Sequence, residues 1–256
     1  MVAASSVTSL QRAADLLRAA HRPAALTGAG ISTPSGIPDF RSQGTGLWER
    51  YDPMQVASLT SFRYDPEAFF ACIRPLAERM VQAEPNAAHV ALARMEAAGK
   101  MAGVVTQNID DLHRRAGSKR VFEIHGHLRT ATCGSCYRQT ETGGLLAEYS
   151  RSGNPPRCSV CGGYLKPDVV LMGEQLPEQV MREAVRLLES CDLLLIAGSS
   201  LEVTPAALLP QRALDAGARL IIVNQEPTYL DVRADIVFYE DVIDILPPLA
   251  DEVLRA

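Results

Sequence analysis

Six apolar runs of strand length, separated by helical patterns, constrain the fold of this chain more than any other feature. They lie near residues 23–26, 102–106, 120–124, 192–197, 219–223 and 235–238. Most of them are continuous rather than alternating, which is typical of parallel strands that are buried on both faces. Helical patterns precede the first run or connect later ones, at residues 9–20 (with Ser9 as cap), 85–98, 178–189 and 205–216. The sequence therefore predicts an α/β fold with a doubly wound, Rossmann-like parallel sheet.

Two segments interrupt this alternation. We expect residues 1–41, 85–126 and 168–256 to form the Rossmann-like domain that contains this sheet. A helical insertion at 42–84 and a cysteine-containing insertion at 127–167 are expected to form one smaller lobe over the carboxyl edge of the sheet. Because ligands often bind where domains meet, the cleft between the lobes is the expected site.

The first apolar run leads into a glycine turn, Gly-Ala-Gly at residues 28–30. In the usual G-x-G-x-x-G fingerprint a third glycine would stand at position 33, but this chain has Thr33 followed by Pro34. The turn is therefore not expected to open into a regular helix, which disfavours an NAD-linked dehydrogenase. A loop rich in Pro, Gly and Ser then reaches three side chains suited to covering a nucleotide, Asp39, Phe40 and Arg41.

Polar side chains follow the next two predicted strands. Gln107, Asn108, Ile109 and Asp110 come directly after the run at 102–106, and His125 with Gly126 follows the run at 120–124. The carboxyl ends of parallel strands meet at one edge of an open sheet, where such sheets bind ligands. We therefore expect these side chains to face one crevice.

Four cysteines form two pairs at metal-ligand spacing. Cys133 and Cys136 are separated from Cys158 and Cys161 by 21 residues, slightly more than is usual for a zinc ribbon. Four thiolates close a tetrahedral structural zinc site. The alternative, two disulfides, is disfavoured by the lack of a secretory signal at the N-terminus. The remaining cysteines, Cys72 and Cys191, are expected to be small core residues.

Composition excludes several function classes. The chain of 256 residues is 47% hydrophobic and 21% charged, with a net charge of −5, so we expect no direct nucleic-acid binding. No apolar run reaches the roughly 18 residues of a membrane span. We expect a cytoplasmic protein of unassigned oligomeric state.

Three parts of the sequence resemble motifs of the sirtuins, which are NAD-consuming protein deacylases. They are the string from residue 25 through Arg41, the segment 106–110 and the His-Gly pair at 125–126. This resemblance continues to the end of the chain, because the predicted strand ends at 198–200 and 224–226 are similar to the motifs that bind the adenosine side of NAD. It implies NAD as co-substrate, one structural Zn²⁺, and proteins with acetylated lysine as substrates.

The resemblance also implies roles for individual residues. Those implied for catalysis are His125, Asn108 and Asp110. Those implied for NAD are Gly28, Ala29, Gly30, Ser32, Thr33, Phe40, Arg41, Gln107, Asn108, Ile109, Asp110, Gly198, Ser199, Ser200, Asn224, Gln225, Glu226 and Val242. Those implied for the peptide substrate are Val169, Met172, Gly173, Glu174, Leu201 and Val203.

The implied reaction transfers the acetyl group from lysine to ADP-ribose. The acetyl oxygen attacks the anomeric carbon of the ribose, and nicotinamide leaves. His125, the implied general base, then removes a proton from a ribose hydroxyl, which lets that oxygen attack the imidate carbon and take the acyl group from lysine. The products are the free lysine, nicotinamide and O-acetyl-ADP-ribose. The helix before Glu84-Pro85-Asn86 would place Ile73 and Leu76 around the acyl group, which favours neutral acyl groups.

Several residues also have structural interpretations. His89 and His113 lie in helical patterns and are expected to be structural histidines, whereas Lys166 is expected at the surface. Asp110 could instead cap the helix that follows it. A zinc-ribbon binding module on a nucleotide sensor without catalysis is the main alternative function, although a pure sensor needs neither His125 nor Asn108.

Overall fold

The computed structural model describes residues 4–39 and 57–255. Its larger sheet is formed by the six predicted runs, which become β1 (Pro23–Thr27), β2 (Val104–Thr106), β3 (Val121–Glu123), β7 (Leu193–Ala197), β8 (Arg219–Val223) and β9 (Ile236–Phe238). All neighbours are parallel, in the order β3-β2-β1-β7-β8-β9. The chain reverses direction across the sheet between β1 and β7, and this is where doubly wound folds bind their ligands.

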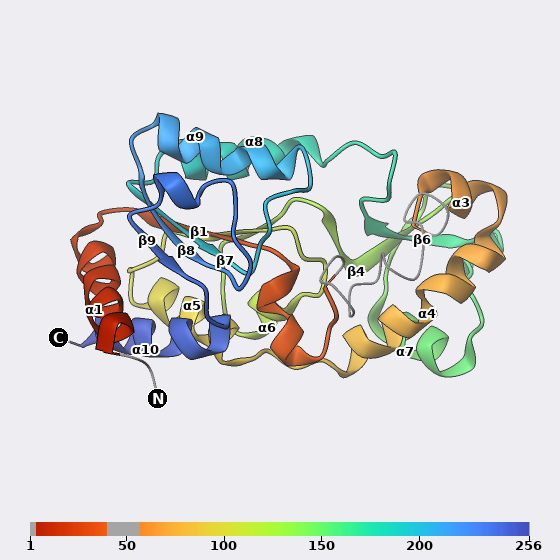
Figure 1. Cartoon of the computed structure of the whole chain (residues 1–256). Coiled ribbons are helices and arrows are strands. Elements are labelled where there is room, and N and C mark those ends of the chain that lie inside the picture. Colours follow the sequence, from red (N-terminus) through yellow and green to blue (C-terminus); the bar gives the residue numbers. More distant parts are fainter. Residues whose placement is uncertain (1–3, 40–56, 256) are drawn as a thin grey trace.

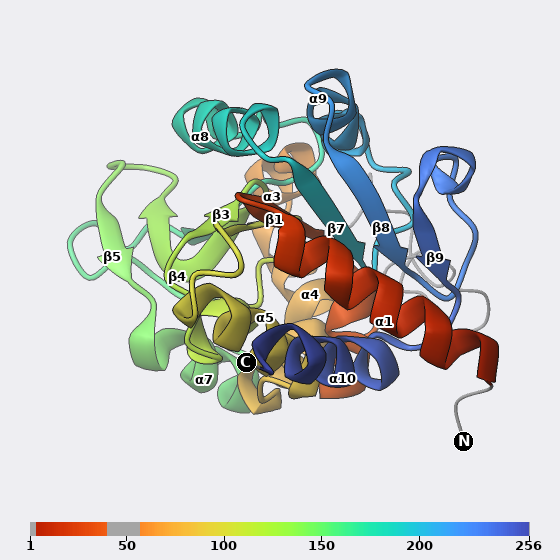
Figure 2. The ribbon, with the colours of Figure 1, turned by 90° about the vertical axis from the view of Figure 1, so that its left-hand side faces the viewer.

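Helices cover both faces of this sheet (Figure 2). On one face lie α1 (Ala4–Ala19), α5 (Ala87–Ala97) and α10 (Val242–Leu254), and on the other lie α8 (Glu178–Glu189) and α9 (Leu209–Asp215). Alternate strand residues point into the two cores: Ala25 packs with the first group, and Ala24 and Leu26 pack with the second. Both faces are therefore buried, which explains why the strands are apolar without interruption.

Two of the helix predictions need correction. Helix α1 begins at Ala4, so Ser9 lies inside the helix and does not cap it. The predicted helix at 205–216 opens with a 3₁₀ turn, Ala206–Leu208, and only then continues as α9. The helix predicted at 178–189 agrees with α8.

A second, antiparallel sheet lies beyond the carboxyl edge of the first (Figure 1). It has the order β5-β4-β6, with β4 at Gly126–Cys133, β5 at Gln139–Glu141 and β6 at Leu165–Val169. Beside it lie α3 (Leu59–Tyr64), α4 (Pro66–Gln82) and α7 (Gly143–Ser152). An aromatic cluster formed by Phe62, Phe69, Phe70 and Tyr149 joins α3, α4 and α7.

The remaining short elements connect the two sheets or follow strands. They are the 3₁₀ turns Ala29–Ile31, Thr33–Ser35 and Asp231–Arg233 and the helix α6 (Leu112–Arg115). Within the described parts of the chain, no helix combines the length and apolar character needed to cross a membrane.

Candidate active site

The glycine turn after β1 lies against the turn after β7. The N–H of Gly30 donates a hydrogen bond of 2.9 Å to the oxygen of Gly198. Gly198 has φ +61°, and a Cβ added to it would lie 2.2 Å from the nitrogen of Ile31, so this crossing requires glycine. Two 3₁₀ turns follow, with Pro34 inside the second, so the prediction that no regular helix begins here is confirmed.

A cleft of about 1110 Å³ opens between the two sheets. Most of the residues that the sequence implies for NAD line it: Gly28, Ala29, Gly30, Ser32, Thr33, Gln107, Asn108, Ile109, Asp110, Gly198, Ser199, Ser200, Asn224, Gln225, Glu226 and Val242. Phe40 and Arg41 lie outside the described residues. Strand ends that are far apart in the sequence thus meet in one cavity.

A buried hydrogen-bond network fixes the polar side chains at the centre of this cleft. Ser32 Oγ donates 2.6 Å to Asp110 Oδ2, and Asn108 Nδ2 donates to Ser32 Oγ and to the oxygen of Gly28, at 3.1 and 3.0 Å. Burial raises the pKa of Asp110, and the bond from Ser32 opposes this shift. Asp110 also accepts a bond from the N–H of Leu112 at the start of α6, so it both lines the cleft and supports the helix.

His125 faces the same cleft from the turn between β3 and β4. Its Nδ1 lies 2.9 Å from the main-chain oxygen of Gln107. A carbonyl oxygen can only accept, so Nδ1 carries the proton and Nε2 of the neutral ring keeps its lone pair. Burial lowers the pKa of His125, and the bond to Gln107 partly offsets this. The site thus holds a neutral imidazole with a free basic nitrogen.

The two helical histidines are structural, as predicted. His89 and His113 are buried and meet with their ring centroids 4.9 Å apart. Nε2 of His113 lies 2.9 Å from Thr27 Oγ1. Burial lowers the pKa of His89 to about 4 and that of His113 well below its ordinary value. Both rings therefore pack as neutral groups behind the cleft.

The segment after β6 forms another wall of the cleft, and Val169, Met172, Gly173 and Glu174 line it. The N–H and oxygen of Met172 already bond to Ala57 and Leu59, at 2.9 and 3.0 Å. The main-chain groups of Met172 are therefore already paired within the protein.

Two predictions concern residues near this wall, and the one for Lys166 is wrong. Leu201 is 4% exposed and its side chain packs in the core beneath α8 and α9, whereas Val203 lines the cleft. Lys166 is not a surface residue. Its Nζ donates to the oxygens of Pro167 and Val169 and lies 3.0 Å from Glu174 Oε2.

The cleft continues between α4 and α7 as an apolar channel. Ile73, Leu76 and Cys72 line it. Cys72 is half-buried, so the prediction that it is a core residue is wrong. Arg74 faces α7 instead, where it donates to the oxygens of Ser150 and Arg151. Three residues of α7 also line the channel: Leu145, Leu146 and Tyr149. The sequence did not indicate this role, because a helix that packs into a core carries the same kind of apolar side chains.

The four paired cysteines gather at one end of the antiparallel sheet, and their sulfur atoms all lie within 4.8 Å of one another. Sγ of Cys133 lies 3.4 Å from that of Cys161, and Sγ of Cys136 lies 3.7 Å from that of Cys158, both far beyond the roughly 2.05 Å of a disulfide. Four such thiolates fit the tetrahedral coordination of Zn²⁺. Cys191 is buried in the core, as predicted.

The doubly wound sheet and the glycine turn at its switch point define a Rossmann-type nucleotide-binding protein with a zinc-ribbon lobe. The Sir2 family model matches residues 28–205. The chain is 42% identical over 247 residues to "NAD-dependent protein deacylase 2" of Archaeoglobus fulgidus, covering 96% of each chain. It is 45% identical over 230 residues to "NAD-dependent protein deacetylase 2" of Caldanaerobacter subterraneus, covering 90% of each.

Solved structures agree with this match. One described as "Structural Basis for the Mechanism and Regulation of Sir2 Enzymes" superposes with a TM-score of 0.89 at 42% identity, covering 96% of this chain and 98% of the other. Another, "Structure of Sir2Tm bound to a propionylated peptide", gives a TM-score of 0.83 at 37% identity, covering 95% and 98%. The chain belongs to the Sir2 family, the sirtuins that its motifs resemble.

Proposed function

We propose that this chain is an NAD-dependent protein-lysine deacetylase that releases nicotinamide and O-acetyl-ADP-ribose. The observation that carries the proposal is the neutral imidazole of His125, held by Gln107 with Nε2 free, in the same cleft as the glycine turn after β1. A nucleotide sensor needs no such base. A dehydrogenase would use a regular helix after its glycine turn, where this chain has two 3₁₀ turns.

Within this proposal the glycine turn at 28–30, Ser32, Thr33 and Arg41 hold the phosphates and the nearer ribose. The strand ends at 198–200 and 224–226, with Val242, hold the adenosine side. The glycine turn at 28–30 follows β1 and the segment 224–226 follows β8, so the two lie on opposite sides of the switch point. A dinucleotide that spans the sheet edge requires this arrangement. Ala29 and Phe40 line the nicotinamide pocket.

Asp110, Ile109 and Asn108 are proposed to bind the nicotinamide amide and to orient the ring for departure. The pKa of Asp110 is raised by burial, yet its Oδ2 accepts a bond from Ser32, so the carboxylate has a fixed direction. When NAD is bound it supplies the anomeric carbon that accepts the acetyl oxygen. His125 takes a proton from a ribose hydroxyl at Nε2, and Gln107 contacts the ribose while its oxygen holds Nδ1. General-base assistance of this kind contributes roughly 10²–10⁴-fold.

The acetylated-lysine peptide is proposed to bind between two walls of the cleft. One wall is the segment with Val169, Met172, Gly173 and Glu174, and the other contains Val203. The main chain of the segment after β6 is anchored to the turn that carries His125, because the N–H of Val170 donates a hydrogen bond of 2.8 Å to the main-chain oxygen of His125. Main-chain pairing explains tolerance of many peptide sequences.

The four-cysteine site is proposed to hold one structural Zn²⁺, which would stabilise the small lobe without taking part in catalysis. Its ligands would be Cys133, Cys136, Cys158 and Cys161. We propose that residues 1–41, 85–126 and 168–256 form the NAD-binding domain and that 42–84 and 127–167 form the small lobe. We also propose a cytoplasmic location, since free thiolates persist in reducing compartments, and no direct contact with nucleic acid or membrane.

Product analysis tests the proposed function. The protein, NAD and an acetyl-lysine peptide should yield nicotinamide and O-acetyl-ADP-ribose in equal amounts, measured by mass spectrometry, and neither should form with the unacetylated peptide. NADH absorbance would instead indicate a dehydrogenase. Binding of NAD without any product would indicate a sensor.

A further inference from the structure

A second cavity, of about 840 Å³, lies on the other side of the segment that carries His125. Its walls come from the edge strand β3, the start of β4 and helix α8. His125 lines the catalytic cleft, whereas the next two residues, Gly126 and His127, line this second cavity. The two cavities therefore share a wall and can be occupied independently.

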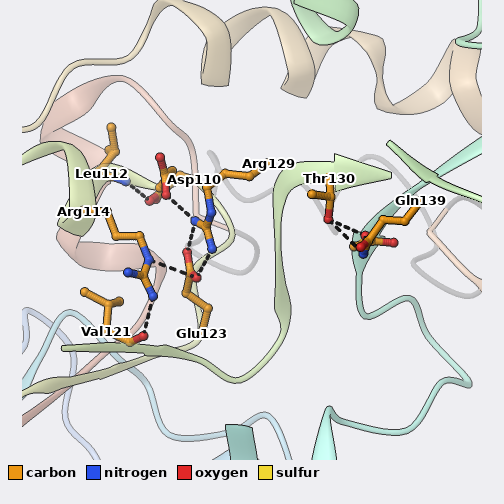
Figure 3. A network of polar contacts seen from close by, with 10 residues as sticks. Asp110, Leu112, Arg114, Val121, Glu123, Arg129, Thr130 and Gln139 are labelled. Atoms are coloured by element: carbon orange, nitrogen blue, oxygen red, sulfur yellow. Dashed lines mark hydrogen bonds and ion pairs between the residues drawn. The ribbon is translucent and has the colours of Figure 1, made fainter. Parts of the chain in front are cut away.

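The second cavity is rich in positive charge although the chain as a whole has a net charge of −5. Six cationic side chains line it, against three carboxylates. Figure 3 shows that Glu123 is already bound: Arg129 donates to both of its oxygens, at 2.7 and 2.5 Å, and Arg114 donates to it at 3.4 Å. Asp168 accepts from Thr132 and Gln139, each at 2.7 Å. These two carboxylates are thus satisfied within the protein, which leaves Glu183 as the third carboxylate of the lining against the remaining cations.

Four of the cations have no carboxylate partner among the described residues. They come from three separate parts of the chain and are Arg22, Lys119, Arg120 and Arg186. Single unpaired cations are common on protein surfaces, where water solvates them. Four around one concavity repel one another, and an anion bound between them would remove that repulsion.

The cavity also offers apolar contact. Phe122 and Leu187 line it, and the Arg120 guanidinium lies 6.0 Å from the centre of the Phe122 ring. A ligand with both anionic groups and an organic part would match this mixture.

We propose that this cavity is a second binding site, for a phosphate-bearing small molecule. Phosphate oxygens accept several charge-assisted bonds at once, and guanidinium groups match their geometry. The volume is sufficient for a polyphosphate or a nucleotide, and the apolar wall distinguishes the two sources, because only a nucleotide has an organic part to place against Phe122.

Calorimetric titration of the full-length protein with inorganic tripolyphosphate and with CTP tests the proposal. The titrations are run with and without saturating ADP-ribose, so that the result does not depend on the proposed deacetylase function. We expect one equivalent to bind in both conditions, with affinity falling as salt is raised. Tighter binding of CTP than of tripolyphosphate would identify a nucleotide site, and the reverse order an inorganic polyphosphate site.

The double variant Arg120→Gln/Arg186→Gln should bind the tighter ligand about tenfold more weakly or worse. Arg182→Gln is the matched control, because Arg182 lies on the same helix and pairs with Glu178 outside the cavity. This control should bind like the unmutated protein. Both variants should keep the thermal midpoint of the unmutated protein, which verifies folding. The proposal is overturned if neither ligand binds to the unmutated protein, if ADP-ribose abolishes binding, or if Arg182→Gln loses as much affinity as the double variant.

Discussion

Nδ1 of His125 lies 2.9 Å from the main-chain oxygen of Gln107, and this contact determines which imidazole nitrogen can act as a base. The carbonyl fixes the proton on Nδ1 and leaves Nε2 with its lone pair. The side chain of Gln107 is held in turn, because its Nε2 donates 2.8 Å to Ser199 Oγ at the end of β7. The His125 ring is thus linked through one residue to the opposite side of the cleft.

Replacing His125 with alanine should reduce deacetylation by roughly 10²–10⁴-fold, because the general base is lost. ADP-ribose binding should change little, since the glycine turn and the late strand ends that are proposed to hold it are untouched. Turnover is measured by nicotinamide release and binding by calorimetry. Turnover equal to that of the unmutated protein would contradict the assignment of His125.

The pH dependence of kcat/KM follows from the direction of the His125 pKa shift. Burial penalises the charged imidazolium, so the pKa lies below its ordinary value of 6.5 and the neutral ring predominates at pH 6.5 and above. The rate should therefore be constant near neutrality and fall only as pH drops through this lowered pKa. A pH–rate profile checks this, and an acidic limb centred above 6.5 would argue against the buried neutral ring.

Cys133→Ser or Cys158→Ser should lose bound zinc and lower the thermal midpoint of the protein, because a closed Cys₄ site contributes directly to folding. Metal content by mass spectrometry and thermal unfolding measure both effects. Cys72→Ser is the control, since its thiol lines the cleft and lies outside the cluster, and it should keep its zinc. Absence of zinc from the unmutated protein would refute the site.

Neutral acyl groups should be preferred over succinyl-lysine. Ile73 and Leu76 line the channel, while Arg74 bonds to α7 and offers no counter-charge there. Burying an unpaired carboxylate costs on the order of several kcal/mol, so kcat/KM for a succinyl peptide should be at least about tenfold lower than for acetyl or butyryl. Conversely, Ile73→Tyr/Leu76→Arg should raise succinyl activity. A succinyl preference in the unmutated enzyme would refute this interpretation.

Lys166→Met should raise KM for the peptide roughly threefold to tenfold while changing kcat less, because Lys166 and Glu174 hold the segment that is proposed to bind substrate. Glu174 Oε2 also accepts the N–H of Leu171 at 2.8 Å, so the pair fixes the main chain on both sides of the turn. Arg182→Met, which removes an exposed pair with Glu178, is the matched control and should leave KM unchanged. An unchanged KM in Lys166→Met would show that the pair does not position the segment.

Local sequence patterns sufficed for the sheet and for the chemistry it carries. Continuous apolar runs identified all six parallel strands, because burial on both faces leaves no polar alternation. The cysteine spacing indicated the metal site, since two turns suffice to point four thiolates at one ion. Strand-end position brought Asn108, Asp110 and His125 to one crevice for the same reason: parallel strands end at a common edge.

Tertiary structure decided what depends on contacts between distant segments. The proton on Nδ1 of His125 is set by an oxygen 18 residues away. Leu201 belongs to the core because α8 and α9 cover it. Lys166 points inward because its ammonium group pairs with the carboxylate of Glu174. The second cavity unites cations from before β1, before β3 and on α8, which no local pattern relates. Sequence thus determined which groups are present and which elements carry them, while the packing of those elements determined each group's partner, protonation and exposure.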